Sequence, residues 1–227
     1  MHGNPVDDLL DASMINVREL GKKLLFRYTP LGAPTYPYTS DPIELALLVM
    51  EMERLRGFPG IVLEVGVARG MTTRFLAEHA RRSTQDRIVA LDTFNSFTKR
   101  DLDYEMQHRG KTAAELAGFG YNDFDAWKRN FHHLSSIVTA IQADCAEFDY
   151  ATLGPIKMAY LDVDLYLPTK AALPKIFENT MSGGVIFVDD VAASNGGYDG
   201  AYHAYMEFCV GHNMEPKIHG KCGEIRK

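Results

Sequence analysis

The chain has 227 residues, enough for one α/β domain, and its 46% hydrophobic and 24% charged residues are typical of a globular protein. The net charge of −6 argues against general binding to nucleic acids. Cys145, Cys209 and Cys222 are too widely spaced for a disulfide framework or zinc site. No signal peptide is visible, and no stretch approaches the ~20 apolar residues of a membrane span. We therefore expect a cytoplasmic protein that binds neither nucleic acid nor membrane.

Residues 1–40 are expected to form an N-terminal arm ahead of a single domain over 41–227. Val17–Phe26 has apolar residues at helical spacing, and the proline-containing stretch Thr29–Ser40 is predicted to be extended. The arm could cover the active site, pack against a second subunit in a homodimer, or lie on its own domain.

A helix is predicted from Asp41 to about Arg56. Asp41 is a suitable N-cap, Pro42 suits the first helical position, and Glu44 completes a capping box. Gly57 ends this helix and leads the chain to the first strand.

The stretch Ile61–Gly70 is predicted to be a strand followed by a glycine turn, with a helix over Met71–Arg82. Its near-continuous apolar run is typical of a strand that is buried on both faces. The turn, Glu64-x-Gly66-x-x-x-Gly70, lacks the third close glycine that a dinucleotide pyrophosphate requires. S-adenosylmethionine has no phosphate, and its cationic ammonium and sulfonium groups would tolerate Glu64. The alternative is a tight turn in which Glu64 only caps the helix.

Two further predicted strands end near acidic residues. Arg87–Leu91 leads to Asp92, whose carboxylate could accept hydrogen bonds from both hydroxyls of a ribose. Ile137–Gln142 leads to Asp144, which could accept a hydrogen bond from the exocyclic amine of adenine. An ordinary turn aspartate is the alternative for Asp92.

Residues 98–125 form a long polar insertion between these two strands. Thr98–Arg109 is densely charged, and aromatic residues are interleaved with glycines in the stretch that follows. We predict a lid over a substrate site, whose aromatic residues suit the apolar faces of a sugar or polyketide. A solvated helix pair is the alternative. A helix over Asp125–Leu134 is expected to lead into the next strand.

Paired aspartates follow two consecutive predicted strands. Asp162 and Asp164 end one strand, and Asp189 and Asp190 follow the next, Gly184–Val188. Neighbouring parallel strands would bring Asp162, Asp189 and Asp190 together, where they repel one another unless a cation joins them. Carboxylate oxygens suit Mg²⁺, with Mn²⁺ or Ca²⁺ as other occupants. Turn and cap formation is the alternative.

The rest of the chain completes an α/β pattern. Helices are expected at Tyr166–Asn179 and Tyr202–Val210, and a turn at Ser182–Gly184. Pro216–Gly220 and Gly223–Lys227 are predicted to be two short antiparallel strands, which would distinguish a methyltransferase sheet from a dehydrogenase sheet. We therefore expect a Rossmann-like α/β fold with a seven-stranded, mostly parallel sheet and helices on both faces.

Four motifs resemble those of the macrocin O-methyltransferase family over about residues 40–215. They are Glu64-x-Gly66-x-x-x-Gly70, Asp92-Thr93-Phe94, Leu161-Asp162-Val163-Asp164-Leu165-Tyr166 and Gly183-Gly184-Val185-Ile186-Phe187-Val188-Asp189-Asp190. The resemblance implies the class I methyltransferase fold and methylation of sugar hydroxyls that depends on S-adenosylmethionine and Mg²⁺.

The resemblance also implies roles for particular residues. Asp162, Asp189 and Asp190 would hold the metal, and the cofactor would be held by Glu64, Gly66, Gly70, Asp92 and Asp144. The chain departs from the family pattern at Val163, where glycine is common, and in the 98–125 insertion. The insertion leaves the acceptor open.

Methylation of a hydroxyl requires a group that removes its proton, and a bound divalent cation would lower the pKa of that hydroxyl. Asp162 could both contact the metal and accept the proton. Asp164 points to the opposite side if the strand continues, but a loop could redirect it. His108 in the insertion is another candidate base.

We therefore predict a metal-dependent O-methyltransferase that uses S-adenosylmethionine and acts on a hydroxyl of a sugar or other small natural product. An NAD(P)-dependent oxidoreductase is the main enzymatic alternative, although hydride transfer does not need the carboxylate cluster. A non-catalytic cofactor-binding protein is the alternative of another class.

Overall fold

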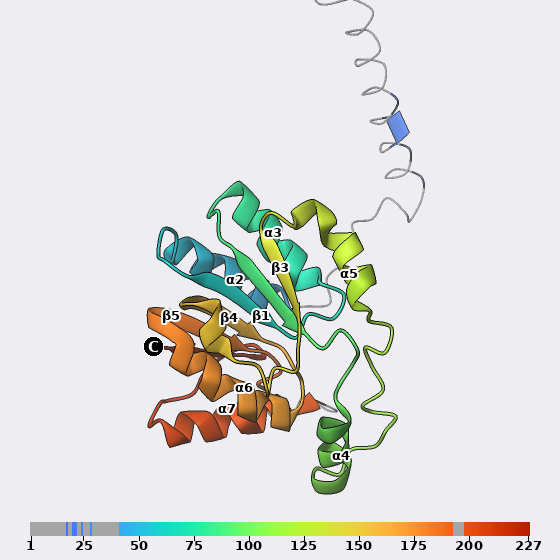
Figure 1. Cartoon of the computed structure of the whole chain (residues 1–227), viewed down its shortest axis with the longest axis vertical. Helices are drawn as coiled ribbons and strands as arrows, with labels where there is room; N and C mark the ends of the chain where they lie inside the picture. The colour runs from blue at the N-terminus through green and yellow to red at the C-terminus, as the bar shows by residue number, and fades with distance from the viewer. Residues whose placement is uncertain (1–16, 18–19, 22–23, 25–27, 29–40, 193–197) are drawn as a thin grey trace, which may run out of the picture. The chain divides into compact units, whose positions relative to one another are not determined.

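The computed structural model describes residues 17, 20, 21, 24, 28, 41–192 and 198–227. The chain divides into two units, Met1–Tyr38 and Thr39–Lys227. The predictions for the arm, including the extended stretch Thr29–Ser40, fall almost entirely outside the described residues. The second unit contains the sheet and the helices that cover it (Figure 1).

Within the described residues, the sheet has seven strands in the order β3-β2-β1-β4-β5-β7-β6. Strands β1 to β5 pair in parallel, whereas β7 is antiparallel to both β5 and β6. The strands are β1 Ile61–Val65, β2 Ile88–Asp92, β3 Val138–Gln142, β4 Ile156–Leu161, β5 Thr180–Val188, β6 Lys217–His219 and β7 Cys222–Arg226. The predicted doubly wound sheet with its closing antiparallel hairpin is confirmed.

Helices cover both faces of the sheet because each strand offers apolar side chains on both sides. On one face lie α2 Pro42–Arg54, α3 Met71–Arg82 and α5 Phe124–Phe131, and on the other α6 Tyr166–Asn179 and α7 Gly200–Gly211. Helix α4, Lys99–His108, packs against α6 (Figure 1). Two 3₁₀ turns, η2 His132–Leu134 and η3 Tyr150–Leu153, precede β3 and β4.

The start of α2 follows from its sequence. The Asp41 side chain accepts a hydrogen bond from the Ile43 amide at 2.7 Å, and Pro42 occupies the first turn. Glu44, predicted to serve the cap, is also buried at 1% exposure and accepts a hydrogen bond from the Tyr160 hydroxyl. The helix therefore delivers an acidic side chain to the interior, next to β4.

The predicted turn at Ser182–Gly184 is wrong, because these residues lie inside β5. The pairing of β4 with β5 shifts in register between Ile156 and Met158, opposite these glycines. Gly183 has a φ of +80°, and a Cβ on Gly184 would lie 2.9 Å from the Lys157 carbonyl oxygen. The two glycines thus form an irregularity within a strand, which a local pattern cannot distinguish from a turn.

A buried ion pair supports the amino end of β4. Lys157 is 1% exposed, and its ammonium contacts Asp86 and the Leu55 carbonyl oxygen. We expect Asp86→Ala to cost about 3–5 kcal/mol of unfolding free energy, since Lys157 would stay buried without its counter-charge. Urea unfolding would measure the loss, and the double variant Asp86→Ala/Lys157→Met should recover most of it. Wild-type stability of the single variant would contradict a contribution from this pair.

None of the helices among the described residues has the length and apolar character that crossing a membrane requires.

Candidate active site

The glycine turn after β1 passes close to the end of β4. Gly66 has a φ of +84°, and a Cβ there would lie 1.7 Å from the Asp162 carbonyl oxygen. Gly70 has a φ of +83° at the N-cap of α3, where a Cβ would lie 2.4 Å from the Phe131 ring. Both positions therefore exclude a side chain for reasons of backbone conformation and of space.

Asp92, at the end of β2, holds this turn in place. Its Oδ2 accepts hydrogen bonds from the amides of Val67 at 2.6 Å and Ala68 at 3.1 Å. Its Oδ1 accepts from the Phe94 amide at 2.6 Å. Asp92 also lines a cleft beside this turn, and its ribose role stays a prediction. Its contacts with the backbone are a structural role that the sequence did not indicate.

Asp144 lies two residues after β3 and lines the same cleft. One carboxylate oxygen accepts from the Ala146 amide at 2.9 Å, and the other contacts the Arg100 guanidinium of α4 at 3.2 Å. Its predicted contact with adenine stays a prediction. The partner Arg100, which comes from the insertion, could not be inferred from spacing.

Two hollows adjoin at the carboxyl edge of the sheet. The first contains Asp92 and Asp144. The second is lined by Glu64, Arg69 and the aspartates that follow β4 and β5. Gly66 and Asp162 line both, so a molecule in the first hollow can extend toward the aspartates.

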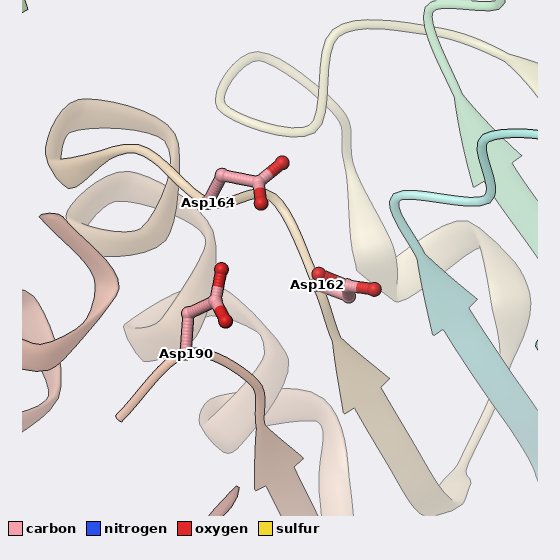
Figure 2. A group of neighbouring side chains, drawn as sticks. All are labelled: Asp162, Asp164 and Asp190. Atoms are coloured by element: carbon pink, nitrogen blue, oxygen red, sulfur yellow. The ribbon is translucent and has the colours of Figure 1, made fainter. Parts of the chain in front are cut away.

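Three carboxylates converge in the second hollow. Asp162, Asp164 and Asp190 each offer an oxygen, and these atoms all lie within 4.8 Å of one another (Figure 2). Asp164 and Asp190 each have a φ of +58°. Both residues have therefore left strand geometry. The expectation that Asp164 would point away from Asp162 is wrong, because residues two apart already share a face of a strand and the Asp164 carboxylate lies in the cluster.

This cluster differs by one member from the set that the resemblance implies. Asp189 also lies at the end of β5, but its carboxylate accepts from the Tyr160 hydroxyl at 3.1 Å and from the Lys221 ammonium at 2.8 Å. The metal role of Asp189 stays a prediction, and Asp164, which was not predicted to be a metal ligand, offers an oxygen to the cluster. Lys221 also contacts Asp190, at 3.2 Å.

Burial makes the ionised form of these carboxyls unfavourable. Desolvation, followed by the charge of Asp189, raises the pKa of Asp162 well above its usual range. Desolvation and the adjacent Asp190 raise the pKa of Asp164 in the same way. Carboxylates held this close favour either a shared proton or a cation, and three oxygen ligands are the donor set that Mg²⁺ prefers. The residues therefore fit a divalent cation.

A second layer of polar groups lies behind the cluster. The buried Tyr160 hydroxyl lies between Glu44 and Asp189. Desolvation and the charge of Asp189 raise the pKa of Glu44 to about 7. Glu44, Tyr160 and Lys221 were not predicted to be site residues. They come from three separate parts of the chain, so no local pattern marks them.

Glu64 is buried under the glycine turn at 1% exposure, and desolvation raises its pKa to about 8. Its Oε2 has no hydrogen-bond partner among the described residues. A cationic group in the second hollow, which Glu64 lines, would favour its ionised form.

This pKa predicts a pH-dependent difference between wild type and Glu64→Gln. The folded protein keeps the Glu64 proton up to about pH 8, whereas the unfolded chain loses it near 4.5. Raising the pH from 5 to 8 therefore removes stability from the wild type that the variant retains, on the order of a few kcal/mol at about 1.4 kcal/mol per pKa unit. Urea unfolding of both proteins at pH 5 and pH 8 measures the difference, and parallel pH profiles would contradict it.

The aromatic residues within and around the insertion divide into two groups. Phe97 and Phe119 lie 5.4 Å apart between ring centroids and line the first hollow, and Tyr198 lies 6.2 Å from Phe97. Burial, followed by the charges of Asp164 and Asp190, raises the pKa of Tyr198. Other aromatic residues, among them Trp127, pack into the core instead.

His108, the candidate base from the insertion, is exposed in the last turn of α4 and lies beside Tyr104, with ring centroids 4.8 Å apart. It is not among the described residues that line either hollow. The structure therefore does not bring His108 to the aspartates.

The order of the strands, with its antiparallel β7, and the cleft at the carboxyl edge define the class I methyltransferase fold. Residues 63–191 match the methyltransferase domain family, and because this match covers more than half of the chain, the chain belongs to that family. No curated protein matches it.

Solved structures support the same fold. CalS11, a calicheamicin methyltransferase, is similar with a TM-score of 0.64 and 17% identity over 100% of this chain and 94% of that chain. The O-methyltransferase NovP gives 0.65 and 17% over 91% and 88%. An apo structure of CalS11, a TDP-rhamnose 3'-O-methyltransferase, gives 0.55 and 20% over 100% and 96%. At these identities the likeness establishes the fold.

Proposed function

We propose that the protein is an S-adenosylmethionine-dependent O-methyltransferase that acts on a hydroxyl of a sugar or related small natural product, as the resemblance to macrocin O-methyltransferases implies. The observation that carries this proposal is the cluster of Asp162, Asp164 and Asp190 beside the glycine turn. CalS11, a TDP-rhamnose 3'-O-methyltransferase, and NovP, an O-methyltransferase, are named for activities of the same kind.

The cofactor would lie across both hollows. Asp92 and Asp144 line the first hollow, where they suit the ribose and the adenine. Gly66, which lines both hollows, would let the backbone of the turn approach the cofactor, and Gly70 would support the same turn at the start of α3. Glu64 lines the second hollow, where its carboxylate suits the cationic end of the molecule.

Asp162, Asp164 and Asp190 would hold a divalent cation, for which we propose Mg²⁺. When bound, this cation supplies charge that lowers the pKa of the acceptor hydroxyl. We propose Asp164 as the acceptor of the hydroxyl proton, with Asp162 as the alternative base. Both line both hollows, where cofactor and acceptor would meet.

The rings of Phe97, Phe119 and Tyr198 would form the wall against which the acceptor lies. Aromatic faces suit the apolar face of a sugar and exclude water from the reacting atoms. We keep the 98–125 insertion as the proposed lid of this site. A cytoplasmic location and a homodimer formed through residues 1–40 are also proposals.

Calorimetric titration with S-adenosylhomocysteine, once with Mg²⁺ and once with EDTA, tests the proposal, with NADH as the control ligand. We expect micromolar binding of S-adenosylhomocysteine and none of NADH, and acceptor screening with deoxysugars and catechols would follow. Binding of NADH instead would overturn the proposed cofactor and the roles that depend on it.

A further inference from the structure

Asp164 lies in a short loop, and the insertion contacts the first residue after that loop, Tyr166. This loop connects β4 to α6, and α6 has no side-chain cap on its own N-cap residue, Leu165. The first amides of a helix need acceptors, so an uncapped buried helix start requires a partner from elsewhere in the fold. That partner comes from α4, which the sequence places in the insertion.

Glu105 of α4 supplies the missing cap. Its Oε1 accepts a hydrogen bond from the Tyr166 amide at 2.8 Å, across 61 residues of sequence. Its Oε2 accepts from Arg109 at 2.9 Å. The side chain is 1% exposed. A carboxylate this deeply buried is stable only when both oxygens are used, and here one of them holds the residue that follows Leu165.

The Glu105–Arg109 ion pair extends to the start of α7 through further contacts. Arg109 and Lys111 each contact Asp199 at 2.9 Å, and Asp199 is the N-cap residue of α7. The negative charges of Glu105 and Asp199 are therefore balanced by the positive charges of Arg109 and Lys111, between α4 and α7. Their charges tie the insertion to a second element that borders the aspartate cluster.

The start of α7 also contacts Asp164 and the residue at which α6 begins. The Ala201 amide donates to the Asp164 carbonyl oxygen at 3.2 Å. A Cβ on Gly200 would lie 2.3 Å from the Tyr166 amide nitrogen, so the two backbones are in close contact. Asp164 holds a left-handed conformation with a φ of +58°, which needs support on both sides to persist.

We propose that Glu105 is a positioning residue: by capping α6 and pairing with Arg109, it holds the Asp164 loop in the conformation that brings the Asp164 carboxylate to Asp162 and Asp190. This role rests on the proposed function, because it gives the insertion a task in building the metal and base site in addition to covering the acceptor.

The test compares Glu105→Ala, Glu105→Gln and the matched control Asp103→Asn. Asp103 is on the same helix, where it pairs with the exposed Lys99. The readouts are hydrogen exchange of the peptide spanning 162–166, Mn²⁺ affinity by electron paramagnetic resonance, and affinity for S-adenosylhomocysteine. Mn²⁺ probes the three aspartates, and S-adenosylhomocysteine probes the cofactor side.

We expect Glu105→Ala to speed exchange at 162–166 and to weaken Mn²⁺ binding about 10–100-fold, as is usual when a partner behind a metal ligand is removed. Affinity for S-adenosylhomocysteine should fall much less than affinity for Mn²⁺, because Asp92 and Asp144 of the first hollow do not belong to the Asp164 loop. Glu105→Gln keeps an acceptor for the Tyr166 amide and should restore part of the loss, and Asp103→Asn should behave as wild type. Wild-type exchange and Mn²⁺ affinity in Glu105→Ala would overturn the proposal.

If Glu105→Ala fails to fold, Glu105→Gln and Arg109→Met decide the question, because each removes the ion pair and leaves an acceptor for the Tyr166 amide. Wild-type exchange and Mn²⁺ affinity in both would then overturn the proposal. Failure of the wild type to bind S-adenosylhomocysteine or Mn²⁺ would instead refute the proposed function, and exchange at 162–166 would still report on the positioning.

Discussion

Asp190→Asn is expected to lower kcat for methyl transfer by about 10²–10⁴-fold, the equivalent of several kcal/mol of transition-state stabilisation. The Asp190 carboxylate offers one of three oxygens that lie within 4.8 Å of one another. An amide in its place keeps the size of the side chain and removes the charge. The remaining acids, Asp162 and Asp164, would then bind a divalent cation weakly, so the acceptor hydroxyl would keep its proton.

Rates measured over a Mg²⁺ titration, together with binding of S-adenosylhomocysteine, identify the cause of this loss. Affinity for S-adenosylhomocysteine should fall far less than kcat, because Asp190 lines only the second of the two hollows across which the cofactor would lie. Asp125→Asn is the control, since Asp125 pairs with Lys128 on the exposed side of α5. Full-rate methyl transfer by Asp190→Asn without added metal would show that the metal mechanism is wrong.

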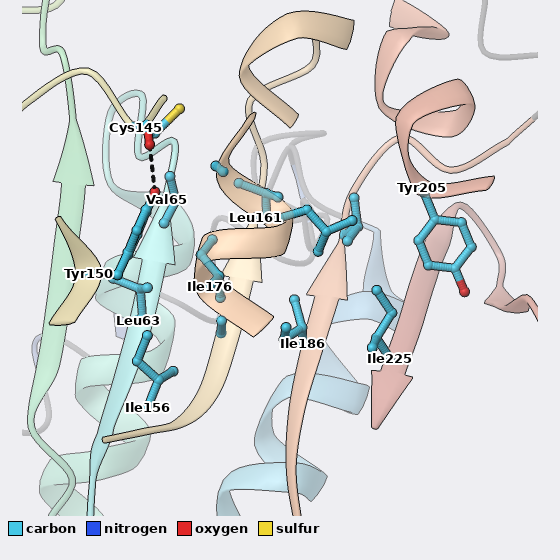
Figure 3. Close-up of a cluster of buried hydrophobic side chains, with 14 of the residues drawn as sticks. Leu63, Val65, Cys145, Tyr150, Ile156, Leu161, Ile176, Ile186, Tyr205 and Ile225 are labelled. Atoms are coloured by element: carbon cyan, nitrogen blue, oxygen red, sulfur yellow. Dashed lines mark hydrogen bonds between the residues drawn. The ribbon is translucent and has the colours of Figure 1, made fainter. Parts of the chain in front are cut away.

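The sheet could be predicted because its strands are buried on both faces and therefore appear as continuous apolar runs. Figure 3 shows one of the two core layers that result, with Leu63, Leu161 and Ile186 from adjacent strands packed beneath Ile176 of α6. Helix caps such as Asp41 could also be predicted, because a cap depends on residues that are close in sequence. Burial and capping leave a signal within a few residues of sequence.

The membership of the aspartate cluster could not be predicted, because it depends on backbone conformation after the strands end. Alternation along a strand puts residues two apart on the same face, so the expectation that Asp164 would point away from Asp162 was wrong. The φ of +58° at Asp164 shows that the strand has ended before this residue, and although aspartate is enriched in this conformation, its presence alone does not predict it. The choice between Asp164 and Asp189 is therefore made by tertiary contacts.

The supporting residues were missed for a related reason. Glu44 meets Tyr160 across 116 residues, and Glu105 meets Tyr166 across 61. In the sequence, Glu44 looks like a capping residue and Glu105 like one of many charges in a polar stretch. A pattern of residue types cannot indicate which charge in such a stretch is buried.

Gly66→Ala is expected to have the largest effect on folding, a loss of more than about 4 kcal/mol of unfolding free energy, which is exceptional for one substitution. Its Cβ would lie 1.7 Å from the Asp162 carbonyl oxygen, a backbone atom that a rotamer change cannot move. The turn and the end of β4 would have to separate. That separation would break the hydrogen bond from the Asp162 amide to the Val65 carbonyl oxygen, now 2.8 Å long.

Gly57→Ala separates the backbone conformation from the clash. Gly57 has a φ of +78°, close to the +84° of Gly66, but a Cβ there would meet nothing within 4 Å. A left-handed alanine alone should cost about 1–2 kcal/mol. Urea unfolding followed by the fluorescence of Trp127, the single tryptophan of the chain, gives both values. Equal losses in the two variants would contradict the close approach of the turn to the end of β4.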